Sequence, residues 1–207
     1  MLDKILDFIA PHHCYNCQKT GSILCSCCKN NILQALKSNP NLTSQLKNDQ
    51  MVYLEDGNGI LKKLIYYYKL NSVRALSKIF AEIIYETVDF KESLFIVPIP
   101  TIKRSQRQRG FGHMEDIGQE LARISGWQYA PILANSSKLA QKDLKSKQRH
   151  DNINQHLQLK PDIKIHSNKT YLIIDDITTT GATLERAQSV LSTAGAKKII
   201  CLALVHK

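Results

Sequence analysis

The residues best placed to do chemistry are two adjacent carboxylates, Asp175 and Asp176, which follow the apolar run at 171–174. A short apolar run without polar alternation predicts a strand that is buried on both faces, as in a parallel sheet. After Ile177 come four small hydroxyl or glycine residues, and from Leu184 onward the apolar residues recur at helical spacing. The predicted order is therefore strand, acidic pair, tight loop and helix.

The loop after the acidic pair has the composition of a phosphate site. Backbone N–H groups of small residues can close on an anion, and Gly181 permits a close approach. The positive end of a helix that begins near Thr183 points at the same place. The carboxylates would repel this phosphate, but they suit the vicinal hydroxyls of a ribose and are candidate water-mediated ligands of Mg²⁺. A phosphate one sugar away from a diol is ribose 5-phosphate, and its predicted binding residues are Asp175, Asp176, Thr178, Thr179, Thr180, Gly181, Ala182 and Thr183.

Residues 171–183 resemble the 5-phosphoribosyl-1-pyrophosphate (PRPP) motif of the type I phosphoribosyltransferases at every position of that motif. The alternative is a strand–turn–helix joint with two incidental aspartates, which we disfavour because unneeded charges at the end of a buried strand are costly. Several purine-transferring members of this family carry an acidic residue where this chain has Thr179. A purine acceptor is therefore not implied.

Five of the six cysteines fall within a short N-terminal segment, as two CxxC pairs separated by a short loop. Four thiolates at this spacing predict a closed, structural Zn²⁺ site in a segment too short for its own core, with Cys14, Cys17, Cys25 and Cys28 as ligands. Disulfides are the alternative, and they are disfavoured in a chain without a secretory signal. Cys27 is a spare thiol, His12 and His13 are substitute ligands that the set does not need, and Cys201 is a small core residue.

Composition indicates a globular chain of 207 residues with a net charge of +10 and 43% hydrophobic residues. The basic balance points to an anionic partner, either a phosphorylated substrate, a nucleic acid or a membrane surface. We expect no membrane-spanning segment and no signal peptide, because residues 1–14 mix acids with apolar residues. The expected location is the cytoplasm, with peripheral attachment at the inner membrane left open.

The region between the cysteines and the acidic pair is predicted to be mostly helical. Helices are expected over 5–9, 28–36, 60–68, 75–84 and 114–124, and strands over 51–54, 94–97, 127–133 and 198–205, with Gly195 capping the helix that ends at Ala194. Residues 38–50 are polar and predict a weak boundary, so we expect an N-terminal zinc module over 1–50 and a second domain over 51–207. The aromatic run at 66–68 beside Lys69 has two interpretations: a base-stacking surface, or tyrosines that cover a core.

Two basic segments flank the predicted sheet. The first follows the strand at 94–97 as a loop, where α/β sheets bind ligands, and it is a candidate diphosphate site because arginine can hold phosphates bidentately. The second, at 135–152, is long enough to act as a lid over phosphates. The candidate diphosphate ligands are Lys103, Arg104, Arg107, Arg109 and Arg149, and the alternative for both segments is a solvated basic surface.

Together, the paired CxxC, the segments VPIP at 97–100 and RGFGH at 109–113, Arg149 with Asn152, and the PRPP motif resemble the ComF (ComFC/GntX-like) family over nearly the full chain. The resemblance implies a zinc-knuckle module followed by a type I phosphoribosyltransferase fold, a parallel sheet flanked by helices. It also implies a role in DNA uptake during natural transformation, with incoming single-stranded DNA and a DNA-translocating helicase as partners. Family members usually read RGFNQ, so contacts by the last two side chains are not carried over to Gly112 and His113.

Two functions of different class remain open. One is an enzyme that moves ribose 5-phosphate from PRPP to an unidentified acceptor, with Mg²⁺ and the basic loops stabilising the leaving diphosphate. The other is a DNA-handling protein that uses the fold to sense PRPP or to bind a strand without turnover. No residue in the sequence stands out as the catalytic base.

Overall fold

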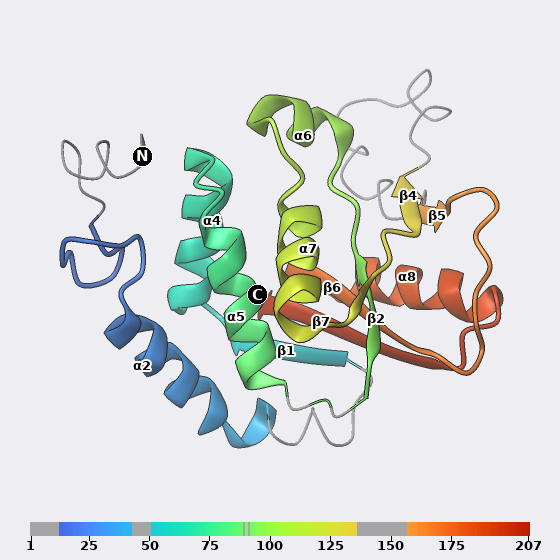
Figure 1. Cartoon of the computed structure of the whole chain (residues 1–207), viewed down its shortest axis with the longest axis horizontal. Coiled ribbons are helices and arrows are strands. Elements are labelled where there is room, and N and C mark those ends of the chain that lie inside the picture. The colour runs from blue at the N-terminus through green and yellow to red at the C-terminus, as the bar shows by residue number, and fades with distance from the viewer. Residues whose placement is uncertain (1–12, 43–50, 89, 91, 136–156) are drawn as a thin grey trace.

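The computed structural model describes residues 13–42, 51–88, 90, 92–135 and 157–207 (Figure 1). Its centre is a five-stranded sheet in the order β1-β7-β6-β2-β3, in which every neighbouring pair is parallel. The strands are β1 (Met51–Asp56), β2 (Leu94–Pro98), β3 (Gln128–Tyr129), β6 (Thr170–Thr178) and β7 (Lys198–His206). Two further strands, β4 (Leu133–Asn135) and β5 (Leu157–Leu159), pair antiparallel as a separate ribbon.

Helices cover both faces of the sheet, as buried strands of a parallel sheet require. They are α2 (Ser26–Lys37), α4 (Ile60–Asn71), α5 (Leu76–Thr87), α6 (Lys103–Arg109), α7 (His113–Ser125) and α8 (Ala182–Thr193). One hydrophobic cluster joins α2, α4, α5 and α7 to one face of the sheet, and a second joins α8 and the β4–β5 ribbon to the other (Figure 1).

The central strand β6 divides its side chains between these two clusters. Leu172 and Ile174 belong to the cluster under α4, α5 and α7, whereas Tyr171 and Ile173 belong to the cluster under α8. Successive side chains of a strand point to opposite faces, so Asp176 continues the row of Leu172 and Ile174. This alternation directs Asp176 toward the face of the sheet that α4, α5 and α7 cover.

Most predicted elements are confirmed within a few residues, but three expectations need correction. The strand expected over 127–133 is broken, because Pro131 has no N–H for the ladder and the chain leaves the sheet edge there to form the β4–β5 ribbon. The loop expected at 103–109 is the short helix α6. The acidic pair lies inside β6, which continues to Thr178, and does not follow its end.

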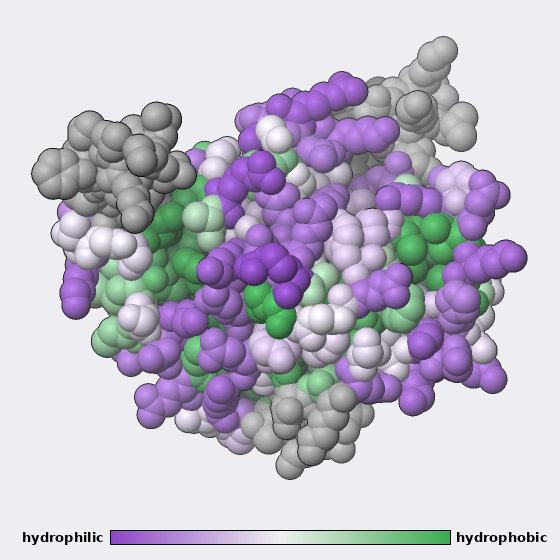
Figure 2. Space-filling view, viewed as in Figure 1, coloured by the Kyte–Doolittle hydropathy of each residue, from purple (hydrophilic) through white to green (hydrophobic). Residues whose placement is uncertain are grey.

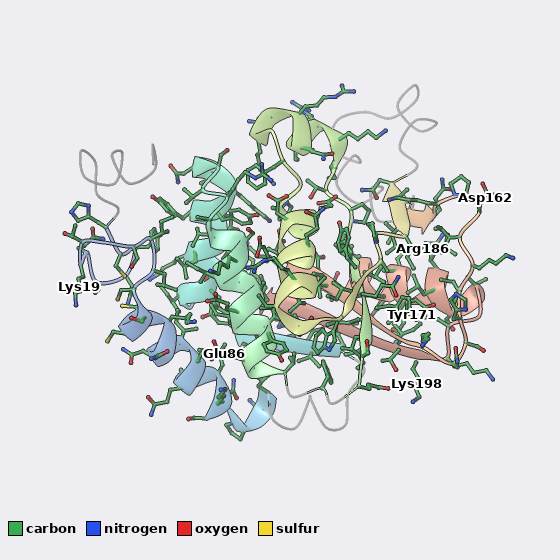
Figure 3. The ribbon with its side chains drawn as sticks, viewed as in Figure 1. Lys19, Glu86, Asp162, Tyr171, Arg186 and Lys198 are labelled. Carbon is green, nitrogen blue, oxygen red and sulfur yellow. The ribbon has the colours of Figure 1, made fainter. Side chains whose placement is uncertain are left out.

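The described part of the cysteine segment packs on the rest of the chain. Leu24, Ile32 and Leu36 share one hydrophobic cluster with α4 and α5. Lys29 Nζ lies 2.9 Å from Glu82 Oε2 and 3.4 Å from Glu86 Oε1, both on α5 (Glu86 is labelled in Figure 3). The division into domains over 1–50 and 51–207 stays a prediction, and the helix expected at 5–9 lies outside the described residues.

Across the residues that the structure describes, none of the helices combines the length and the apolar character needed to span a membrane.

Candidate functional site

A pocket of about 230 Å³ opens beyond the end of β2, whose last residue, Pro98, pairs with Ile174 of β6. The chain runs from β2 to β3 on one side and returns to β6 on the other, so this is the point at which the strand order reverses, where open α/β sheets bind ligands. Residues 99–102 after β2 form one wall, and Asp175, Asp176 and Thr183 form another. The sequence-predicted acidic pair therefore lies in the pocket.

Asp176 is held by two side chains from different helices. Its Oδ2 atom is bound by Lys69 Nζ from α4 and by His113 Nε2 from α7, and the side chains of all three residues are largely buried. Burial by itself would raise the pKa of the Asp176 carboxyl, but the charge of Lys69 and the hydrogen bond from His113 outweigh it and hold that pKa well below its usual range. Asp176 is thus a buried carboxylate whose negative charge is neutralised by Lys69 of the same chain.

Asp175 has the opposite character. It is partly buried, and its Oδ1 atom accepts a hydrogen bond from the Asp176 backbone N–H at 2.9 Å. Burial, and then the neighbouring charge of Asp176, raise the pKa of Asp175 to about 8. The two aspartates therefore differ in charge near neutral pH, which adjacent positions in the sequence do not reveal.

This donor set bears on the predicted Mg²⁺ site. One carboxylate already shares its Oδ2 atom between an ammonium group and an imidazole N–H, and the other has a raised pKa. Mg²⁺ takes oxygen ligands in near-octahedral geometry and usually keeps several waters beside one or two ionised carboxylates. Asp175 and Asp176, as arranged here, do not suit direct coordination of Mg²⁺, and their water-mediated contact with it stays a prediction.

A chain of hydrogen bonds positions the imidazole of His113. Glu115 accepts from the Thr101 backbone N–H at 2.9 Å and from Thr101 Oγ1 at 2.7 Å, which fixes the segment after β2 against α7. Thr101 Oγ1 lies 3.2 Å from His113 Nδ1, and Arg109 Nη1 lies 3.3 Å from the same nitrogen. With Nδ1 occupied in this way, Nε2 faces Asp176.

The threonine loop forms the turn that the sequence predicts before α8. Gly181 adopts a φ of 78°, and its N–H donates to Thr178 Oγ1 at 2.9 Å, which closes the turn. Thr179 and Thr180 are exposed, whereas Thr183 lines the pocket. The loop thus brings the first turn of α8 to the acidic pair, and its predicted contacts with a phosphate stay a prediction.

The predicted diphosphate residues are not equivalent. Arg109 lines the pocket, whereas Lys103 lines a neighbouring cavity. Arg104 and Arg107 are exposed on α6, whose outer surface is hydrophilic (Figure 2). Arg149, with the rest of the basic segment, lies outside the described residues. Of the described candidates, Arg109 is therefore the one placed beside the acidic pair.

A second cavity, of about 310 Å³, adjoins the first and shares Pro100, Thr101 and Asn135 with it. Asn135 Nδ2 donates to the Pro100 carbonyl oxygen at 3.0 Å, so this shared wall is tied to the β4–β5 ribbon. Lys103 and Lys160 lie along its edge. The second cavity is therefore separated from the pocket of the acidic pair by one shared wall.

The predicted metal ligands also come together. The Sγ atoms of Cys14, Cys17, Cys25 and Cys28 all lie within 4.8 Å of one another. Cys25 is the N-cap of α2 and its Sγ atom accepts from Cys28 N, while Cys14 Sγ accepts from Cys25 N at 3.4 Å. Cys27 is exposed and does not belong to the cluster, and all six cysteines are free. The disulfide alternative is not what the structure shows.

The electrostatics of this cluster suit a cation. Burial opposes ionisation of Cys14, but hydrogen bonds from nearby backbone N–H groups outweigh it and lower the pKa of that thiol to about 6. Asn16 donates to Cys28 Sγ, yet burial and the three neighbouring thiols raise the pKa of Cys28 to about 12. Cys14 therefore ionises readily, and its neighbouring thiols then resist ionisation. A bound metal ion such as Zn²⁺ would offset the repulsion between the thiolates.

Comparison with known proteins agrees with this architecture. Residues 123–207 match the family model of the phosphoribosyl transferase domain. The chain is 29% identical to Competence protein ComFC of Streptococcus pneumoniae (strain ATCC BAA-255 / R6), over 99% of this chain and 85% of that protein. This chain is thus similar to a ComFC protein over nearly its whole length. A second relative, Competence protein F of Haemophilus influenzae, is 25% identical over 73% of this chain and 70% of that protein.

Solved structures also match this chain at low identity. One is the allosteric regulatory enzyme of purine biosynthesis, with 18% identity, a TM-score of 0.40 and coverage of 63% of this chain and 24% of that one. Another is a hypoxanthine phosphoribosyltransferase from Staphylococcus aureus, with 15% identity, a TM-score of 0.36 and coverage of 66% and 64%. The parallel sheet flanked by helices and the match to the phosphoribosyl transferase domain give this chain a type I phosphoribosyltransferase fold, with a four-cysteine N-terminal cluster that can hold a metal ion.

Sequence reasoning missed Lys69, His113, Thr101 and Glu115 as parts of the site. In the sequence, Lys69 stands beside a run of tyrosines, but Tyr68 next to it is fully buried and donates to the His113 carbonyl oxygen at 3.3 Å. His113 stands where the ComF family usually has glutamine. The available signal is its position: a titratable residue that opens α7, one of the two helices between β2 and β3.

Proposed function

We propose that this chain is a PRPP-binding ComF protein that acts in DNA uptake and natural transformation, where it handles incoming single-stranded DNA in the cytoplasm. The observation that carries the PRPP part is the meeting of the acidic pair, Thr183 in the first turn of α8, and Arg109 at one pocket. A ribose fits the carboxylate side and a 5-phosphate fits the loop and helix end, because hydroxyls donate to carboxylates and backbone N–H groups donate to phosphate.

The DNA part of the proposal rests on charge and on relatives. The net charge of +10 favours polyanions, and the exposed α6 residues Lys103, Arg104 and Arg107 add a basic surface beside the pocket. Both curated relatives are named competence proteins. A helicase partner and peripheral attachment to the inner membrane are extensions of the same proposal.

Calorimetry with PRPP tests the pocket assignment. The double variant Asp175→Ala/Asp176→Ala should bind PRPP at least about tenfold more weakly, since a hydrogen bond to a charged group typically contributes about 1.5–3 kcal/mol. Glu120→Ala, which changes a carboxylate on the outer side of α7, is the matched control and should bind like the wild type. Unchanged affinity in the double variant would remove the site assignment.

The alternative function is a phosphoribosyltransferase enzyme that moves ribose 5-phosphate to an unidentified acceptor. The second cavity favours it, because an acceptor bound there would lie across Pro100, Thr101 and Asn135 from the ribose site. Release of diphosphate from PRPP in a screen of nucleophilic acceptors would support turnover. Tight PRPP binding with no diphosphate release from any acceptor favours sensing.

A further inference from the structure

The acidic pair carries its own cation. Lys69 Nζ and His113 Nε2 both bind Asp176 Oδ2, and the exposed fractions of the three side chains are 18%, 10% and 8%. An unpaired carboxylate that is buried to this degree would destabilise the folded chain. The ion pair with Lys69 offsets the cost of burying Asp176. The cation comes from α4, an element that the match at 123–207 does not include.

The fold holds Lys69 in this position. Asp176 follows Leu172 and Ile174 on the sheet face that α4, α5 and α7 cover, so a side chain from α4 can reach it. Tyr68, the preceding residue, is fully buried, contacts Phe80 and Phe111, and donates to the His113 carbonyl oxygen. The backbone of Lys69 is thereby anchored to the first turn of α7, and its ammonium group is directed at one carboxylate.

Charge balance follows from these contacts. The ammonium of Lys69 offsets the carboxylate of Asp176, so the acidic pair carries at most one negative charge that is not neutralised by this ion pair. A site of two ionised aspartates would repel a sugar phosphate and would need a divalent cation to neutralise it. Here the neutralising charge is the ammonium group of Lys69.

We infer that Lys69 takes the place of a divalent cation at the acidic pair, so that this chain binds ribose 5-phosphate and PRPP without a metal ion at Asp175 and Asp176. The inference rests on the proposed PRPP site and concerns how that site is neutralised. In this arrangement, the sugar hydroxyls are contacted by Asp175, while Asp176, Lys69 and His113 form the charged wall behind it. Lys69 is a binding and positioning residue and has no bond-making role.

The experiment is calorimetric titration of ribose 5-phosphate, which lacks the metal-chelating diphosphate, into the full chain in buffer without Mg²⁺ or with Mg²⁺. The Mg²⁺-free buffer is treated with a chelating resin before the protein is added, so that metal held by the cysteine cluster stays in place. The wild type should bind equally well, within about twofold, in both buffers. Lys69→Met should lose about tenfold or more in the Mg²⁺-free buffer, as expected for a lost charge-assisted contact, and should recover part of that loss in Mg²⁺. Lys63→Met, on the exposed side of the same helix, is the matched control.

Lys69→Arg guards against a folding defect, since it keeps the charge and should retain binding in the Mg²⁺-free buffer. Manganese binding measured by electron paramagnetic resonance adds an independent readout: Lys69→Met should gain a site that the wild type and Asp176→Asn/Lys69→Met lack. Loss of ribose 5-phosphate binding by the wild type in the Mg²⁺-free buffer, with full binding in Mg²⁺, would overturn the inference alone. Absence of binding of both ribose 5-phosphate and PRPP in either buffer would overturn the proposed function itself.

Discussion

The ring of Tyr15, in the first CxxC knuckle, packs against the ring of Tyr67 on α4 with 4.8 Å between the centroids. Two residues further along the same helix, Lys69 binds Asp176 in the pocket. The cysteine cluster and the acidic pair are therefore connected through one helix.

The first prediction concerns the metal. One Zn²⁺ should copurify with each chain, because the four Sγ atoms converge and their mutual repulsion favours a cation. Cys28→Ser should reduce the zinc content measured by metal analysis. Cys27→Ser is the matched control, since this neighbouring thiol is exposed and is not part of the cluster, and it should leave the content unchanged. Stoichiometric zinc in the absence of any of the four clustered cysteines would contradict the ligand assignment.

The second prediction concerns the connection between the two sites. Tyr67→Ala should weaken PRPP binding by about 0.5–2 kcal/mol, roughly a factor of two to thirty, because it releases α4 from the cysteine module. Removal of zinc by a chelator should act in the same direction, and the two effects should not add. Tyr66→Ala, which removes an exposed tyrosine from the same helix, is the control for affinity measured by calorimetry. Equal PRPP affinity in Tyr67→Ala and wild type would show that the two sites are independent.

The third prediction concerns pH and stability. The pKa of Asp175 is raised from 3.8 to about 8, so between these pH values the folded chain keeps a proton that the unfolded chain has released. The contribution to the free energy of unfolding is therefore fully present below pH 3.8 and is lost as the pH rises through about 8. Asp175→Asn, which mimics the protonated side chain, should remove this part of the pH dependence.

Thermal melts across that pH range measure the effect. Asp162→Asn, at an exposed aspartate on the connection that follows β5 (labelled in Figure 3), is the control and should keep the wild-type pH profile. A profile for Asp175→Asn that parallels the wild type would mean that Asp175 is ionised in the folded protein.

The fourth prediction concerns single-stranded DNA. Binding of a labelled oligonucleotide should weaken with salt, and the slope of log affinity against log salt should fall by about 0.7 for each phosphate contact removed. Arg104→Ala/Arg107→Ala removes two exposed cations of α6, and Arg123→Ala, whose guanidinium pairs with Glu120, is the control. Competition by saturating PRPP then separates two paths: displacement indicates a shared basic surface, and its absence indicates a path along the cysteine module. No oligonucleotide binding even at low salt would remove the DNA part of the proposed function.

The sequence by itself determined the local features of this protein. The apolar run at 171–174 and the small residues after Ile177 specify a buried strand and a turn, since both depend on the residues themselves: hydrophobic burial, and a positive φ that glycine allows at Gly181. The paired CxxC likewise determined the cysteine cluster, because ligand spacing along the chain limits which thiols can meet.

Only the tertiary structure decided which distant residues complete the site. Strand alternation predicts that Asp175 and Asp176 face opposite sides of the sheet, but not that α4 and α7 cover the side of Asp176. Lys69 precedes Asp176 by more than a hundred positions, and its neighbours Tyr67 and Leu70 give no sign of a buried partner. The different pKa values of the two aspartates follow from that packing, because desolvation and ion pairing depend on which groups the fold brings within contact distance.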